Sequence, residues 1–286
     1  MASNNKLGNF DTLVLSGGSI NSIIMLGSLQ YASDNYLLSH INIYIGTSAG
    51  SICCYLLAIG YTPVEIIVYM CTKQILEKMK HFSLLGALKG EGATTFTYIH
   101  ESLEKMTIDK IGRLITLKEL NTLYNKTLVC ITHNFTSNRI EKLSHDNYPD
   151  MPCLIALRMS SNLPLIFDRF KYLGSYYIDG GISNNFPIDI GDEMGQKILG
   201  LVIINNQGMV DKNVNMNTVE YVYDLMTIPM TQIIKKNISN ASSKCTIITI
   251  NPSKTSFFDF DIDLSTKLEM FSDGYCQIKK FFGNEI

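Results

Sequence analysis

The chain has 286 residues, 46% of them hydrophobic, and a formal net charge of -2. This length and apolar content are sufficient for one large α/β domain or two small ones and exclude a chain that is disordered as a whole. The charge is almost balanced and contains no run of Lys or Arg, so no nucleic-acid partner is expected.

Seven cysteines form no C-x-x-C pair, and several lie in apolar runs, which favours a reducing compartment. The first ten residues, MASNNKLGNF, lack the apolar core of a signal peptide. The most apolar region, residues 51–71, is interrupted by Pro63 and Glu65, so it predicts two helices too short to span a bilayer. We expect a soluble cytoplasmic protein without a signal peptide or transmembrane helix, whose only membrane contact would be peripheral.

The first third of the chain alternates predicted strands and helices. A short apolar run at residues 12–16 predicts a buried strand, and a helical pattern follows at about 22–38. A second strand is predicted at 41–45 and a helix at 49–59. Thr62 and Pro63 are typical of a helix start, and that helix is expected to extend to about residue 80.

The middle of the chain has a weaker pattern. Residues 81–125 contain early glycines and one helical stretch near 98–105, which indicates an irregular excursion from the main sheet. Strands are predicted at 127–134 and 139–143, followed by a buried helix at 151–161.

In the last third of the chain, predicted strands and helices alternate again. A hairpin is predicted at 170–178, an apolar strand at 197–205 and a helix at 218–239. A final strand at 245–250 precedes a C-terminal helix near 264–282. Strands interleaved with helices predict an α/β fold with three α/β/α layers around a central, mostly parallel sheet. Without an internal repeat or a long linker, a single domain spanning residues 1–286 is expected.

One serine stands in a setting that favours a nucleophile. In IGTSAGS, Ser48 lies between Gly46 and Gly50, after the second predicted strand and before a helix. This is the G-x-S-x-G pattern of a nucleophile elbow, in which glycines permit a sharp turn and the helix N-terminus directs N–H groups at the site. The alternative is a helix N-cap, a position that serine also suits. The local pattern leaves both interpretations open.

A serine nucleophile needs a group that accepts its proton. In the hydrolase order of Ser, acid and then His, the chain could use only His133 or His145 with an earlier acid. The other solution is a carboxylate that contacts the serine directly. Asp179 is the best candidate, because it ends a predicted strand and precedes Gly180 and Gly181. The alternative for this residue is an Asp-Gly turn.

An oxyanion site is the third requirement of acyl transfer. The sequence SGGS follows the first predicted strand, and its glycines would allow backbone N–H groups to converge on a substrate oxygen. Gly17, Gly18 and Ser19 are therefore the candidate donors. A dinucleotide-binding loop is disfavoured, because Ser19 and Ser22 stand where G-x-G-x-x-G would need its later glycines.

Four ordered segments together resemble the patatin-like phospholipase family. They are the glycine loop LVLSGGSINSIIMLGSLQ, the elbow GTSAGSICCYLLAIGYTPVEI, the segment ALRMSSNLPLIF and the segment YIDGGISNNFP. The resemblance implies a patatin-like fold over most of the chain and a serine hydrolase with a Ser-Asp dyad and no catalytic histidine. Ser48 would be the nucleophile and Asp179 its partner, with the oxyanion hole at Gly17, Gly18 and Ser19.

The resemblance also implies the substrate class. We expect hydrolysis of fatty-acyl esters of glycerophospholipids through an acyl-enzyme, at a membrane surface, with no metal or other cofactor. Other acyl-ester lipids are a second substrate option, and a protein activator remains open.

The glycine loop departs from the family pattern. That pattern is Gly-Gly-Gly-x-Arg/Lys-Gly, whereas this chain has GGSINS at residues 17–22. A Cβ at Ser19 would strain the loop if its φ were positive. Two alternatives to an active dyad enzyme therefore stay open: a lipid-binding protein of the same fold with weakened catalysis, and a Ser-His-Asp esterase that uses His133 or His145.

Overall fold

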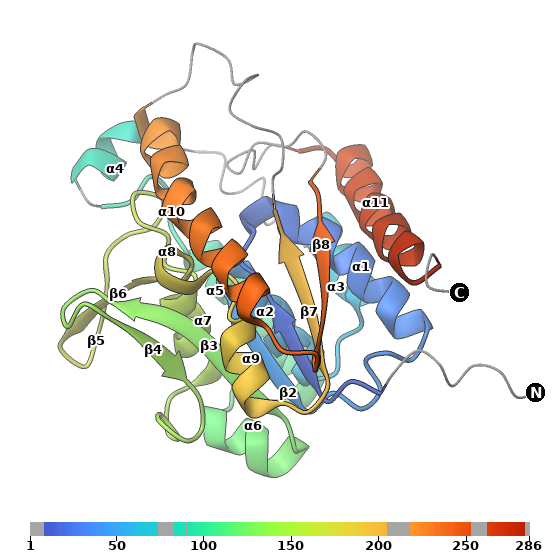
Figure 1. The fold of residues 1–286 in the computed structure, drawn as a ribbon. Helices are drawn as coiled ribbons and strands as arrows, with labels where there is room; N and C mark the ends of the chain where they lie inside the picture. Colours follow the sequence, from blue (N-terminus) through green and yellow to red (C-terminus); the bar gives the residue numbers. More distant parts are fainter. Residues whose placement is uncertain (1–8, 74–82, 90, 205–217, 253–261, 284–286) are drawn as a thin grey trace, which may run out of the picture.

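The computed structural model describes residues 9–73, 83–89, 91–204, 218–252 and 262–283. They form a layered α/β structure around an eight-stranded mixed sheet with the strand order β5-β6-β3-β2-β1-β7-β8, and β4 pairs with β3 (Figure 1). The strands are β1 (Thr12–Leu15), β2 (Ile43–Thr47), β3 (Thr127–Asn134), β4 (Arg139–Leu143), β5 (Phe170–Tyr172), β6 (Ser175–Asp179), β7 (Ile198–Ile203) and β8 (Cys245–Ile250).

The sheet is parallel at its centre. β1 pairs in parallel with β2 and β7, β2 with β3, and β7 with β8. Among the described residues, four of the seven strand pairings are parallel, and the antiparallel pairings all involve β3 or β5. The predicted fold class, three layers with a mostly parallel central sheet, is confirmed.

Helices cover both faces of the sheet (Figure 1). On one face α1, α2 and α7 pack with α11 into the larger hydrophobic cluster, and on the other face α9 and α10 cover Val14, Ile45 and Val129. The helices of eight or more residues are α1 (Ser22–Asp34), α2 (Ala49–Ala58), α3 (Pro63–Lys73), α5 (Thr97–Ile111), α6 (Leu117–Tyr124), α7 (Cys153–Ser160), α10 (Thr218–Asn240) and α11 (Leu264–Gly283). The shorter ones are η1 (Ser19–Asn21), α4 (Leu84–Lys89), α8 (Gly181–Asn184) and α9 (Ile188–Met194).

Most predicted elements are present, with two main differences. The first helix ends at Asp34 instead of residue 38, and the helix predicted to reach residue 80 is described only to Lys73, beyond which its prediction lies outside the described residues. The helical stretch expected near 98–105 is part of α5, which is longer than expected, and α6 is a second helix where an irregular excursion was expected. α6 begins with a capping box between Thr116 and Glu119, a signal that is visible in the sequence.

In the part of the chain that the structure describes, no single helix is both long enough and apolar enough to cross a bilayer. α2 and α3 pass that test only when taken together, and a bend of 118° separates them.

Candidate active site

Strand β3 brings two distant strand ends together. β2 runs parallel to β3 and ends with Thr47 opposite Ile131, whereas β6 runs antiparallel to it and ends with Asp179 opposite Thr132. β2 and β6 thus approach from opposite directions, and their carboxyl ends meet over two consecutive residues of β3. This topology carries Ser48, the residue after Thr47, to Asp179.

Ser48 occupies a sharp turn between β2 and α2. Its φ of 55° and ψ of -128° form a backbone conformation that side chains rarely adopt. The turn requires close approach: a Cβ on Gly46 would lie 2.5 Å from the Ser51 nitrogen, and one on Gly50 would lie 2.5 Å from the Ser16 carbonyl oxygen. The two predicted elbow glycines are therefore sterically required, and the strained serine fits the nucleophile interpretation better than that of an ordinary N-cap.

Asp179 is buried, with 3% of its surface exposed. The Gly181 N–H donates to its Oδ1 at 2.7 Å, and the Ser48 hydroxyl lies close enough to the carboxylate to influence its pKa. Burial raises the pKa of Asp179 to about 6, and the interactions with the Ser48 hydroxyl and the Gly181 N–H limit that rise. A carboxylate with such a pKa accepts a proton more readily than an exposed aspartate does.

The turn after Asp179 also needs its two predicted glycines. A Cβ on Gly180 would lie 2.2 Å from the Ile131 carbonyl oxygen, because the turn is pressed against β3. A Cβ on Gly181 would lie 2.7 Å from Asn185 Oδ1. A side chain at Gly180 would collide with the backbone of β3, and one at Gly181 would crowd Asp179 Oδ1, which lies 2.9 Å from that Cβ position.

Residues of α7 and the loop after it hold both halves of the site, a role that the sequence analysis missed. Ser160 Oγ accepts the Ser48 N–H at 3.0 Å and donates to the Ile131 carbonyl at 2.6 Å. The Ser160 carbonyl accepts the Gly180 N–H at 3.2 Å, and the Asn162 carbonyl accepts the Asp179 N–H at 2.9 Å. These residues lie in the segment ALRMSSNLPLIF, which supported the family resemblance but to which no role was assigned.

Arg158 supports that loop from within the core. Its guanidinium is almost fully buried, donates to Asn162 Oδ1 and lies 4.5 Å from the centre of the Phe96 ring and 5.0 Å from that of Phe170. It also forms an ion pair with Asp168 at 3.1 Å. Burial lowers the pKa of Arg158 to about 10, against the opposing effect of Asp168.

The glycine loop lies beside Ser48 but offers fewer donors than expected. The Gly17 N–H donates to the Asn185 carbonyl at 3.0 Å, so it already has an acceptor in this structure, and its role as an oxyanion donor stays a prediction. No hydrogen bond to a described residue is found for the N–H groups of Gly18 and Ser19. Ser19 has a φ of 48°, the positive value at which a Cβ strains the loop.

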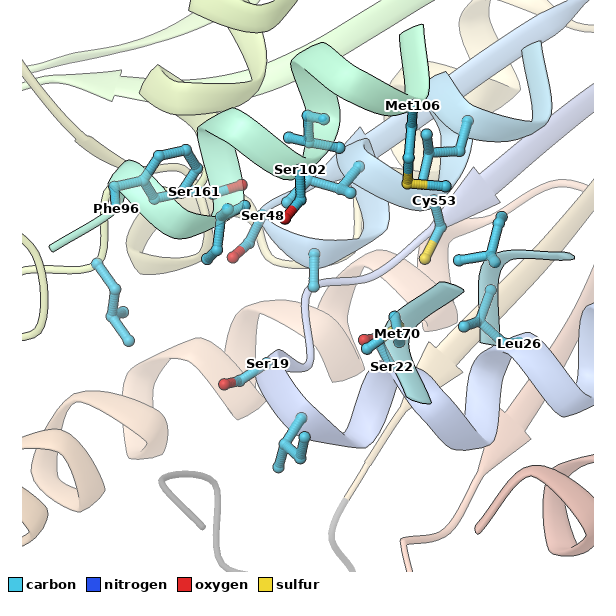
Figure 2. Close-up of a pocket in the computed structure, with 18 of the residues that line it drawn as sticks. Ser19, Ser22, Leu26, Ser48, Cys53, Met70, Phe96, Ser102, Met106 and Ser161 are labelled. Atoms are coloured by element: carbon cyan, nitrogen blue, oxygen red, sulfur yellow. The ribbon is translucent and has the colours of Figure 1, made fainter. Parts of the chain in front are cut away.

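A mainly apolar cavity of about 150 Å³ opens at Ser48. Figure 2 shows Ser48 between two groups of lining residues, with Phe96 and Ser161 on one side and Met106, Cys53 and Leu26 on the other. Ser19 lines the same cavity, so the glycine loop and Ser48 both border it. Such a cavity suits a fatty-acyl chain.

The two histidines of the triad alternative have other partners. His133 Nδ1 lies 2.6 Å from Ser183 Oγ and its Nε2 lies 3.2 Å from Asn138 Oδ1, while His145 lies 3.3 Å from Asp146. In the described part of the chain no hydrogen bond joins either histidine to Ser48. Among the described residues, no cluster of three or more His, Cys, Asp or Glu side chains could hold a metal ion.

The sequence matches one family model, described as patatin-like phospholipase, over residues 13–192. A viral protein named "Probable lipid hydrolase 463L", from Invertebrate iridescent virus 6, is 38% identical over 184 residues, which are 63% of this chain and 63% of the relative. The match therefore spans less than two thirds of that relative's length. An uncharacterized protein of Acanthamoeba polyphaga mimivirus is 28% identical over 94% of this chain and 92% of its own length.

Two solved structures have a similar fold. VipD from Legionella pneumophila superposes with a TM-score of 0.54 at 16% identity, over 97% of this chain and 67% of VipD. The type III effector protein ExoU of Pseudomonas aeruginosa superposes with a TM-score of 0.53 at 15% identity, over 96% of this chain and 53% of ExoU. At these identities the similarity concerns the fold alone.

Proposed function

Because this chain belongs to the patatin-like phospholipase family, we propose that it is a lipid acyl hydrolase in which Ser48 is the nucleophile and Asp179 its proton acceptor. The observation that carries the proposal is the placement of the strained Ser48 beside the buried Asp179, at an apolar cavity. Glycerophospholipids are the proposed substrates, cleaved at a fatty-acyl ester as by a phospholipase A.

The reaction proceeds in two halves. Asp179 accepts the hydroxyl proton as Ser48 Oγ attacks the ester carbonyl carbon, and the carbonyl oxygen takes up the negative charge. The N–H groups of Gly18 and Ser19 donate to that oxygen. As the ester C–O bond breaks, Asp179 returns the proton to the departing alkoxide. Asp179 then takes a proton from water, the hydroxide releases the fatty acid from Ser48, and the serine regains its proton.

We also propose that residues 1–286 form one domain. The family match ends at residue 192, but β7 and β8 extend the same sheet, and α11 packs on α1 at a close crossing. At that crossing a Cβ on Gly27 would lie 1.8 Å from the Phe271 carbonyl oxygen. The last third of the chain therefore shares its core with the part that carries the site.

A fatty-acid release assay on mixed phospholipid vesicles tests the proposed activity. We expect release by the wild type, and losses of about three orders of magnitude or more in Ser48→Ala and Asp179→Asn. Ser102→Ala is the matched control, because this serine lines the same cavity but its hydroxyl donates to the Tyr98 carbonyl at 2.7 Å. Loss of activity in a His133→Ala/His145→Ala variant would support a triad esterase instead.

The glycine loop favours one competing function. With Gly17 bonded to Asn185 and Ser19 at a positive φ, the oxyanion site has fewer and more strained donors than the family pattern implies. A lipid-binding protein with weakened catalysis would bind vesicles and release no fatty acid, alone or with cell extract. The same assay therefore separates the two functions.

A further inference from the structure

Helix α10 turns an apolar surface outward. Tyr221, Leu225 and Ile228 are 57%, 46% and 48% exposed. They follow the i, i+4, i+7 spacing, so they lie on one face of the helix over two turns. A surface helix normally buries such a stripe and directs its polar residues to solvent. In the first half of α10 such a stripe faces solvent instead.

The same face becomes basic further along the helix. Gln232, Lys235 and Lys236 are exposed, and at 100° per residue they fall on the face that Tyr221, Leu225 and Ile228 occupy. Lys235 lies about 10 Å along the axis from Ile228. The outward face of α10 is thus apolar at one end and cationic at the other.

The inner face of α10 packs against the turn that orients Asp179. Met230 is 8% exposed, and its Cε lies 3.4 Å from the position of a Cβ on Gly181, whose N–H donates to Asp179. Further along, Asn237 Nδ2 donates to Asn184 Oδ1 at 3.1 Å. In Figure 1 α10 crosses the front of the molecule next to α8, the helix that starts at Gly181. A partner bound to the outer face of α10 would therefore lie about one helix diameter from the turn after Asp179.

The chemistry of this face selects its partner. Three apolar side chains cannot supply the roughly 800 Å² per partner that a stable protein interface buries. They do suit insertion about 5–10 Å into the boundary between headgroups and acyl chains, where an interfacial helix places its apolar residues. Lysines on the same face would then reach phosphate groups of anionic lipids.

We propose that the outer face of α10 is a docking surface for an anionic lipid bilayer, with Tyr221, Leu225 and Ile228 inserted and Lys235 and Lys236 at the phosphates. The choice of a bilayer as the partner rests on the proposed lipid hydrolase function. Docking through α10 would place the turn after Asp179 about one helix diameter from the bilayer surface.

Vesicle sedimentation in the inactive Ser48→Ala background tests the docking surface without lipid turnover. Vesicles are made of phosphatidylcholine alone or with one third phosphatidylserine. We expect Leu225→Asp/Ile228→Asp to lower the partition coefficient on the mixed vesicles about tenfold or more. The matched control is Leu114→Asp/Leu123→Asp, whose wild-type residues are 42% and 60% exposed next to or on α6. This control variant should bind the mixed vesicles as strongly as the Ser48→Ala parent does.

A second double variant tests the contribution of the two lysine charges to vesicle binding. Lys235→Gln/Lys236→Gln should weaken binding to the mixed vesicles about 30-fold, at about 1 kcal/mol per lysine, and leave binding to phosphatidylcholine unchanged. Circular dichroism and the melting temperature verify that each variant is folded.

Three results would overturn docking through α10: no binding of the parent to either vesicle, equal binding by the apolar pair and the parent, or a dimer that the apolar pair converts to a monomer without loss of vesicle binding. Hydrolysis of a water-soluble short-chain ester, with Ser48 intact, reports on the proposed function separately. If that ester and the vesicles both stay uncleaved while binding depends on α10, the hydrolase proposal fails and the docking surface stands.

Discussion

The hydroxyl of Ser160 accepts a hydrogen bond from the backbone N–H of Ser48 at 3.0 Å. The same hydroxyl donates to the Ile131 carbonyl at 2.6 Å, so one side chain ties the strained elbow to β3. Ser160→Ala would leave the buried Ile131 carbonyl and the Ser48 N–H without these partners. We expect a loss of about 1–3 kcal/mol in the free energy of unfolding and about a tenfold lower kcat.

The neighbouring residue is the control for Ser160. Ser161 is equally buried, but its Oγ has no hydrogen-bond partner among the described residues. Removing a hydroxyl that makes no bond costs little, so Ser161→Ala should match or slightly exceed the wild type in urea denaturation. Equal destabilisation by the two substitutions would mean that packing, and not the bond to Ser48, explains the effect.

Ser19 is expected to limit both stability and turnover. Its φ of 48° favours glycine, so Ser19→Gly should relieve strain of up to about 1 kcal/mol and raise kcat severalfold by freeing the loop. Leu173→Gly is a control for the backbone effect, because Leu173 has a φ of 44° and is 85% exposed in the turn between β5 and β6. It should change the melting temperature in the same direction and leave kcat unaltered. A fall in kcat for Ser19→Gly would show that the serine itself contributes to the site.

The sequence predicts the local elements well and their long-range bonds poorly. The bounds of β3 and β4 agree with the prediction, because each is a strand-forming run bounded by polar turn residues. The motifs also selected Ser48 and Asp179, which the structure places beside each other, although their catalytic roles stay predictions.

The sequence could not predict hydrogen bonds between distant segments, because these bonds depend on how the strands align in the folded sheet. The bond from Gly17 to Asn185 joins residues 168 positions apart, and it exists only because β1 and the turn after β6 meet in the folded sheet. The bond from Ser48 to Ser160 has the same origin. By contrast, the start of α6 was overlooked although its capping box, Thr116 with Glu119, is a local pattern.

Asp179 should couple stability to pH. Its pKa of about 6 in the folded protein exceeds the ordinary value of 3.8, so the folded state binds this proton more tightly than the unfolded state. The favourable contribution is complete below about pH 4 and is lost as the pH rises through 6, at a cost of about 3 kcal/mol above that. Asp179→Asn keeps the acceptor for Gly181 and removes the charge. It should stabilise the protein at about pH 8 and have little effect near pH 4.

The activity profile provides the second readout for Asp179. A proton acceptor must be ionised, so kcat/KM of the wild type should rise with pH to a plateau above about 6. A thermal melt of Asp179→Asn that is unchanged at both pH values, or a wild-type profile that falls across this range, would contradict the role of this carboxylate as a buried base.

Arg158 should matter more to stability than its exposed partner. Arg158→Ala removes the guanidinium from between Phe96 and Phe170 and leaves the buried Asn162 Oδ1 without its donor, for an expected loss of about 3 kcal/mol or more. Asp168 is 53% exposed at its side chain, so Asp168→Asn should cost less than about 1 kcal/mol. Urea denaturation of the two variants measures the difference. Similar losses would place the stabilisation in the ion pair instead of the buried contacts.

Met106 should set the length of acyl chain that the cavity accepts. It is 3% exposed and lies at one side of the cavity in Figure 2, with Ser48 between it and Phe96. A larger side chain there fills space that the far end of a long acyl chain would occupy, whereas a short chain stays near Ser48. Met106→Trp should therefore lower kcat/KM for long-chain esters about tenfold relative to short-chain esters, and the short-chain rate serves as the internal control for folding. An equal fall for both chain lengths would indicate a distorted site, and no change for either would mean that the acyl chain occupies the side lined by Phe96.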